Sequence, residues 1–203
     1  MEQDVLSKAI RHLKKSDTVM ARLINNYPPL DIAARRSNHY HTMVRTIINQ
    51  QLSIKAGATI LQRLITLQGG RVLNAGKVAP LKDRAILKCG ISNNKLRYIR
   101  AITNAVVDGE LNFKRLEKQD DETVISELTH YPGIGQWSAE IFLISSLSRP
   151  DVLPIGDLVL RKSMQKHYPL DSDSPLQDYL EVAQSWRPYR TVASRYLWSA
   201  VLA

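Results

Sequence analysis

Apolar residues recur at the spacing of an α-helix along almost the whole chain, and this pattern restricts the fold more than any other feature. Two representative stripes consist of Met43, Val44, Ile47 and Ile48, and of Ala139, Ile141, Phe142 and Ile144. Residues three or four positions apart share one face of a helix. No segment alternates apolar and polar residues with a period of two between hairpin turns, as paired β-strands would. The sequence therefore predicts an all-α fold of about ten short helices. Ser16 and Ser53 are expected to cap the helices that follow them.

The formal net charge of +9 is unevenly distributed along the chain. Residues 35–100 contain 13 Lys and Arg against one acid, whereas residues 101–130 contain seven acids against three bases. The last 22 residues add Arg187, Arg190 and Arg195 without an acid. This separation favours a polyanionic partner and one face that binds phosphates, although charge alone distinguishes neither DNA from RNA nor nucleic acid from a membrane surface.

Cysteine content and hydropathy exclude several classes of protein. The single cysteine, Cys89, excludes an intramolecular disulfide, a cysteine-based zinc site and a four-cysteine iron–sulfur cluster. No apolar run reaches ~18 residues, so no membrane span is expected. Residues 1–4 lack the basic and apolar regions of a signal peptide. We therefore expect an intracellular protein, cytoplasmic in a bacterium or nuclear in a eukaryote.

Residues 128–139 carry the strongest functional signal. A helical stripe ends at His130, a Pro-Gly-Ile-Gly turn occupies residues 132–135, and a second helical stripe begins at once. Glycines in such a turn let a partner approach the backbone and expose N–H groups at a helix N-terminus. This arrangement suits a DNA phosphate and reads no base sequence. The candidate DNA contacts are Gly133, Ile134, Gly135 and Gln136.

Four segments, in this order, resemble the helix–hairpin–helix DNA glycosylases of base excision repair, and specifically their AlkA-like branch, 3-methyladenine DNA glycosylase II. The segments are residues 47–54, the turn at 132–135, the Pro/Gly-rich loop at 154–158, and residues 186–190 with the chain that follows to Trp198. The resemblance implies two helical lobes with the active site in the cleft between them. One lobe would comprise residues 40–151, and the other residues 1–39 and 152–203. Large relatives carry an additional N-terminal β-rich domain, so this chain resembles a compact form.

The resemblance also implies an enzyme that flips an alkylated purine out of duplex DNA and hydrolyses its N-glycosidic bond. Asp157 would be the catalytic residue. As the base departs, the sugar becomes an oxocarbenium-like cation, which a nearby carboxylate stabilises. The family's Asp also positions or deprotonates the attacking water. A simple N-cap role for Asp157 is compatible with this one, because a helix N-terminus favours the ionised carboxylate.

The base pocket is predicted from aromatic residues at family positions. Trp198 lies where the family places a stacking tryptophan, Trp137 would form one wall, and Tyr196 is a weaker candidate that could equally belong to the core. Ile141 replaces a tyrosine of one branch, which makes the pocket less aromatic. Stacking favours cationic bases by ~0.5–2 kcal/mol, so 3-methyladenine and 7-methylguanine should leave faster than neutral lesions. Trp137 also stands where lyase-type relatives have a Schiff-base lysine, so no AP lyase activity is expected.

A side chain must fill the space that the flipped base leaves in the duplex. By resemblance it comes from residues 50–52, where Gln51 aligns best with this wedge and Leu52 is the alternative. No cofactor is expected except a monovalent cation, Na⁺ or K⁺, which the family's hairpin often binds through main-chain carbonyls. The carbonyls here would be those of Thr129, Tyr131 and Ile134. We expect a monomer that acts on damaged duplex DNA.

Two other functions stay open. A non-enzymatic helix–hairpin–helix module would account for the hairpin and the charge, but gives no reason for Asp157 or the aromatic C-terminal segment. A glycosylase for another lesion, such as uracil, a mismatch or oxidised guanine, is disfavoured because the chain lacks both the four cysteines and the Schiff-base lysine of most such enzymes.

Overall fold

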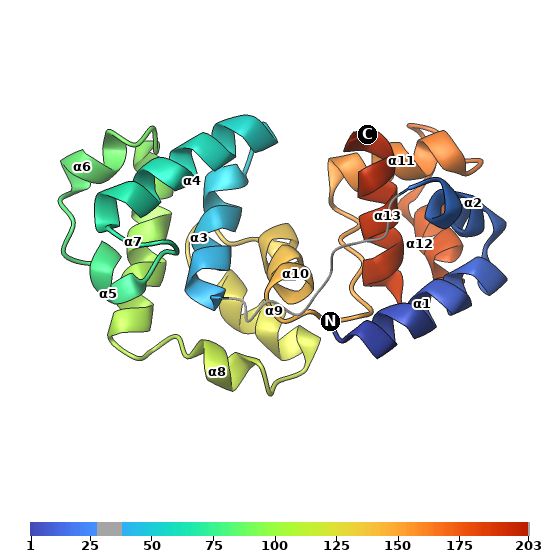
Figure 1. Ribbon diagram of the computed structural model, residues 1–203, viewed down its shortest axis with the longest axis horizontal. Helices are drawn as coiled ribbons and strands as arrows, with labels where there is room; N and C mark the ends of the chain where they lie inside the picture. The colour runs from blue at the N-terminus through green and yellow to red at the C-terminus, as the bar shows by residue number, and fades with distance from the viewer. Residues whose placement is uncertain (28–37, 203) are drawn as a thin grey trace. The chain divides into compact units, whose positions relative to one another are not determined.

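A computed structural model describes residues 1–27 and 38–202 of the chain (Figure 1). Every regular element in these residues is a helix, which confirms the all-α prediction. The described residues form thirteen helices. The sequence predicts about ten helices, and three of those observed, α5 (Ala75–Val78), α6 (Asp83–Leu87) and α8 (Phe113–Leu116), have only four or five residues. Among the helices described, none is both long enough and apolar enough to cross a bilayer.

The chain divides into two compact units. One comprises Met1–Arg35 with Ser148–Ala203, and the other comprises Arg36–Leu147. We call them the terminal unit and the central unit. The lobe boundaries inferred from the family resemblance, at 39/40 and 151/152, and the cleft between the lobes stay predictions.

The terminal unit is built around its last helix. Its helices are α1 (Gln3–Ser16), α2 (Thr18–Asn26), α11 (Leu158–His167), α12 (Leu176–Gln184) and α13 (Arg190–Leu202). Helix α13 packs against α1, α2 and α11 (Figure 1). The core includes the fully buried rings of Trp186 and Tyr196. Asp17 fastens this core, because its Oδ2 accepts hydrogen bonds from Trp186 Nε1 and from the hydroxyl of Tyr168, each at 2.8 Å.

The central unit is built around α3. Its longer helices are α3 (His39–Asn49), α4 (Ile54–Gln68), α7 (Asn93–Val107), α9 (Asp121–Thr129) and α10 (Gln136–Ser145). Helix α3 packs against α4, α7 and α10 (Figure 1). The predicted stripe of α3 is fully buried, with Ile47 and Ile48 both 0 % exposed. Residues 50–52 therefore follow directly after a helix whose last turn is anchored in the core.

The two predicted serine caps have different outcomes. Ser53 caps α4, with its Oγ accepting a hydrogen bond from the N–H of Ala56 at 3.3 Å, as predicted. The prediction for Ser16 is wrong. Helix α1 continues through Ser16, and Asp17 caps α2 by accepting from two N–H groups of its first turn.

Candidate functional site

The turn at residues 132–135, which we call the hairpin turn, joins α9 to α10. Gly133 has φ +81°, in the left-handed region. A Cβ atom at this position would overlap the ring of Tyr98 on α7. Gly133 is therefore required by the fold itself. Ile134 is only 4 % exposed, and its N–H donates to the carbonyl of Tyr131 at 3.1 Å. The side chain of Ile134 therefore packs the turn, and the DNA contact expected of this residue through the turn's backbone stays a prediction.

Gly135 differs from Gly133, because nothing in the fold demands a glycine there. It is the N-cap of α10, with extended backbone (φ −97°, ψ −179°). A Cβ atom on it would meet no atom within 4 Å. The N-caps of α3, α4, α7 and α9 each bear a side-chain hydrogen bond, whereas that of α10 has none. The positive end of the α10 dipole thus has no side-chain cap, a suitable arrangement for a phosphate.

Gln136, the first residue of α10, is exposed, but its side chain is engaged within the helix. Its Nε2 donates to Glu140 Oε1 at 2.8 Å. Glu140 is buried, and burial raises the pKa of its carboxyl above the ordinary 4.5, with the Gln136 hydrogen bond acting in the opposite direction. A phosphate at this helix end would therefore meet an amide side chain whose orientation is already fixed.

Residues 50–52, which we call the wedge loop, connect α3 to α4 and lie against the hairpin turn. Gln50 Nε2 donates to the carbonyl of Gly133 at 2.8 Å and to Ser138 Oγ at 3.0 Å. From α7, Lys95 Nζ donates to the carbonyls of Ile48 at 2.7 Å and Gln50 at 2.8 Å. Burial lowers the pKa of Lys95. The loop is therefore held from two sides.

Both predicted wedge residues are exposed. Gln51 has φ +56°, in a region that residues with a Cβ adopt at a cost of about 1–2 kcal/mol. Strain of this kind occurs most often at functional sites. Leu52 is 39 % exposed. The choice between these two wedge candidates stays a prediction.

Asp157 and Trp198 meet within the terminal unit. Asp157 is the N-cap of α11, and its Oδ1 accepts from the N–H of Leu160 at 2.8 Å. The same oxygen accepts from Trp198 Nε1, on α13, at 3.1 Å. Both side chains are partly buried. The candidate catalytic carboxylate thus lies at a helix N-terminus with an indole N–H directed at it.

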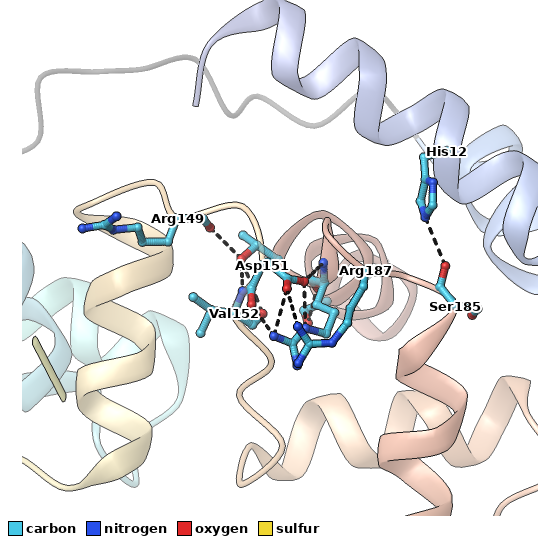
Figure 2. Close-up of polar contacts among 9 residues, drawn as sticks. His12, Arg149, Asp151, Val152, Ser185 and Arg187 are labelled. Atoms are coloured by element: carbon cyan, nitrogen blue, oxygen red, sulfur yellow. Dashed lines mark hydrogen bonds and ion pairs between the residues drawn. The ribbon is translucent and has the colours of Figure 1, made fainter. Parts of the chain in front are cut away.

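The chain that leads to Asp157 is fastened to the start of α13 (Figure 2). The Asp151 carboxylate accepts hydrogen bonds from Arg190 Nε at 2.7 Å, from Arg190 Nη2 at 3.0 Å and from Arg187 Nη1 at 3.1 Å. These pairs correct the interpretation of the C-terminal charge. Arg187 and Arg190 hold Asp151 and are not two unpaired cations for phosphate.

A second contact near Asp151 involves Thr191, which follows Arg190. Its Oγ1 donates to the carbonyl of Arg149 at 2.7 Å and accepts from the N–H of Val152 at 3.0 Å. Trp198 lies about two helical turns further along α13. One helix therefore holds both ends of the loop that ends at Asp157.

The other predicted pocket residues have unequal environments. Trp137 and Ile141 are four residues apart, so they share one face of α10, and both are partly buried. Tyr196 is 1 % exposed and belongs to the core of the terminal unit. We correct its predicted role to packing, because a base could not reach this ring. The complete pocket, with residues from both units, stays a prediction.

In the part of the chain that the structure describes, no group of three or more His, Cys, Asp or Glu side chains could hold a metal ion. Of the three main-chain carbonyls predicted to bind a monovalent cation, that of Tyr131 already accepts the hydrogen bond from Ile134. The cation stays a prediction.

Three residues of this site have no role that the sequence pattern identifies: Gln50, Lys95 and Tyr98. Gln50 lies inside the motif at residues 47–54, which could have pointed to it. Lys95 and Tyr98 are far along the chain from the segments they support, and no motif relates them.

Comparisons with known proteins bear on the whole arrangement. Residues 44–188 match the HhH-GPD superfamily of base excision DNA repair proteins. A curated DNA-3-methyladenine glycosylase 1 from Schizosaccharomyces pombe is 29 % identical over 198 residues, covering 95 % of this chain and 86 % of that protein. The structure of a 3-methyladenine DNA glycosylase from the same organism, in complex with abasic DNA, has a TM-score of 0.86 at 28 % identity and covers 97 % of both chains. A DNA-3-methyladenine glycosidase from Bacillus halodurans has a TM-score of 0.80 at 33 % identity, covering 95 % of this chain and 88 % of that one.

Proposed function

The chain belongs to the HhH-GPD superfamily of base excision DNA repair proteins, and we propose that it is a DNA glycosylase that hydrolyses the N-glycosidic bond of alkylated purines in duplex DNA. The named relatives act, by their names, on 3-methyladenine. The observation that carries the proposal is the hydrogen bond between Asp157 and Trp198. It joins the two residues that this chemistry needs, an anion for the sugar and an aromatic ring for the base.

Asp157 stabilises the transition state through its charge. The glycosidic bond lengthens first, and positive charge develops on the sugar. The N–H of Leu160 at the start of α11 and the indole N–H of Trp198 both donate to Asp157 Oδ1 and hold the carboxylate in place, where its negative charge would stabilise that positive charge. The carboxylate then accepts a proton from the attacking water, and the departing base takes the bonding electron pair. The products are the free base and an abasic site.

Substrate selection follows from the leaving group and the pocket. A methylated purine that carries positive charge leaves as a neutral base, so it needs less assistance. The same charge strengthens stacking on the ring of Trp198 by ~0.5–2 kcal/mol. We therefore expect 3-methyladenine and 7-methylguanine to be released faster than hypoxanthine or 1,N6-ethenoadenine. With Trp137 in place of a lysine, the enzyme has no amine at that position for strand cleavage.

Duplex DNA would be held through the uncapped N-terminus of α10 at Gly135, where backbone contacts read no sequence. A monovalent cation at the hairpin would add positive charge near the same phosphate, with ligands as predicted above. We propose that one copy of the chain suffices, because each predicted role is filled once within it. A DNA substrate requires the compartment that holds the genome.

The decisive experiment is release of 3-methyladenine and 7-methylguanine from methylated duplex DNA by the parent protein and by Asp157→Asn. We expect loss of release by at least about a thousandfold, with duplex binding kept, because the amide can still cap α11 but carries no charge. Asp120→Asn is the matched control, since Asp120 caps α9 in the same way, through the N–H of Thr123 at 2.8 Å. A variant at Asp157 within several-fold of the parent would refute the catalytic assignment. A parent that binds DNA and releases no base would favour the non-enzymatic module.

A further inference from the structure

We propose that Gln50 is a positioning residue that couples the hairpin turn to the wedge loop, so that binding of the DNA backbone fixes where the wedge enters the duplex. This inference rests on the proposed glycosylase function and deepens it. Gln50 would touch neither the flipped base nor the bond that breaks. Its effect on the reaction would pass through the exposed residues Gln51 and Leu52.

The side chain of Gln50 bridges the two segments directly. Its backbone belongs to the wedge loop, while its two hydrogen-bond acceptors belong to the hairpin turn and the first turn of α10, where the phosphate is proposed to bind. One acceptor is the carbonyl of Gly133, in the hairpin turn, and the other is Ser138 Oγ, in the first turn of α10. Ser138 is buried and Gln50 partly buried, so water would replace these bonds poorly. Displacement of either segment would therefore break a hydrogen bond that is costly to lose.

Helix α7 gives this bridge a rigid frame. Lys95 Nζ donates to the carbonyl of Gln50, and the ring of Tyr98, one turn further along, packs against Gly133. The loop and the turn thus share one supporting helix as well as the direct bridge. Sites on such rigid supports hold their geometry better than free loops.

The backbone of Gln51 explains why the wedge loop needs this support. Its φ of +56° is one that side chains with a Cβ rarely adopt. The N–H of Leu52 donates to the carbonyl of Asn49 at 3.1 Å and closes the turn. Without the bonds at Gln50, the loop would gain conformational freedom and the wedge would have to be ordered during base flipping. Flipping already requires unstacking of the base, so any additional ordering slows it.

The test measures single-turnover release of 7-methylguanine from two duplexes that differ only in the opposite base. One pairs the lesion with cytosine, and the other mispairs it with thymine, where extrusion is easier. Gln50→Met keeps the length of the side chain and its neutrality but removes both donated bonds. We expect release to fall about 30-fold on the paired duplex and clearly less on the mispaired one. Ser138→Ala removes one of the two bonds and should give a smaller loss in the same direction.

A double-mutant cycle separates positioning from general stability. In the background Gln51→Ala with Leu52→Ala, which lacks the wedge, Gln50→Met should cause little further loss on the paired duplex. Full additivity in that background, or equal losses on both duplexes, would overturn the proposal and leave Gln50 a stabilising residue. Ser138→Ala serves as the readout if Gln50→Met does not fold. A parent with no base release would instead refute the glycosylase function, a different outcome from an active parent with additive variants.

Discussion

The two glycines of the hairpin turn provide a matched pair, since one is required by the fold and the other, by our reasoning, by DNA. Gly133→Ala should destabilise the protein. Alanine at φ +81° costs about 1–2 kcal/mol, and its Cβ would press on the Tyr98 ring, an overpacking that costs about 1–3 kcal/mol. At about 2–4 °C per kcal/mol, the melting temperature should fall by about 4–20 °C.

Gly135→Ala should leave stability almost unchanged. Its backbone is extended and a Cβ would meet nothing within 4 Å, so no strain arises. Alanine is a poorer N-cap than glycine by about 0.5–1 kcal/mol, and it stabilises the protein by a similar amount, about 0.4–1 kcal/mol, because it lowers the entropy of the unfolded chain. The two effects oppose each other. The melting temperature should therefore shift by no more than about 2 °C.

Among folded molecules, Gly135→Ala should weaken DNA binding more than Gly133→Ala does, which is the reverse of their effects on stability. A methyl group at Gly135 would hold a phosphate away from the N–H groups of α10. Loss of one hydrogen bond to a charged group weakens binding by about 10- to 100-fold. The loss should be equal for unrelated sequences and should leave the salt dependence unchanged, because no side-chain cation is removed. Thermal melts and fluorescence anisotropy at several salt concentrations measure both. A Gly135→Ala protein that melts as early as Gly133→Ala, or binds DNA as well as the parent, would refute this reasoning.

Three further predictions follow from the site. Trp198→Phe keeps a stacking ring but removes the donor to Asp157, so kcat should fall about tenfold with KM little changed; Trp198→Ala should be worse, most of all for cationic bases, and equal rates for the two variants would contradict a role for the N–H. Glu140→Gln should stabilise the protein at pH 8 and not at pH 4.5. Burial raises the folded-state pKa of Glu140, so the protonated carboxyl stabilises the fold below the ordinary pKa of 4.5, and this stabilisation is lost as the pH rises through the folded-state pKa. Thermal melts of both proteins at the two pH values check this, and an equal shift of the melting temperature at both would show the reasoning to be wrong. Borohydride should trap no covalent adduct on an abasic duplex, since Trp137 offers no amine, and a trapped adduct at useful yield would reveal a lyase.

The interiors of the helices could be predicted from the sequence, and their ends could not always be. Burial of Ile47 and Ile48 follows from spacing alone, which is a local property. The cap of α2 is different. Ser16 and Asp17 are adjacent and both are good N-caps, so the local sequence does not choose between them. Asp17 is chosen because its other oxygen bonds Trp186 and Tyr168, more than 150 residues away along the chain.

In the candidate site, too, contiguous motifs can be identified from the sequence, whereas contacts between distant residues cannot. Asp157 and the hairpin turn lie in contiguous motifs, so the sequence identifies them. The aromatic residues of α13 are harder to assign. Tyr196 and Trp198 are two positions apart, or about 200° around a helix, so they cannot share a face. Tyr196 lies in the core and Trp198 donates a hydrogen bond to Asp157. Because both side chains are aromatic, the sequence does not indicate which of the two packs in the core and which faces the site.

Two of the three bases in the C-terminal segment are paired within the protein, which limits what they contribute to DNA binding. The last 22 residues contain three bases and no acid, yet Arg187 and Arg190 both bond Asp151, which precedes that segment. Cations already paired in the protein release few counterions when DNA binds, so they contribute little to the salt dependence. Their function is to hold residue 151 at one end of α13 while Trp198 holds Asp157 further along. Part of the basic charge that indicated a DNA partner therefore serves instead to position the carboxylate that would act on that DNA.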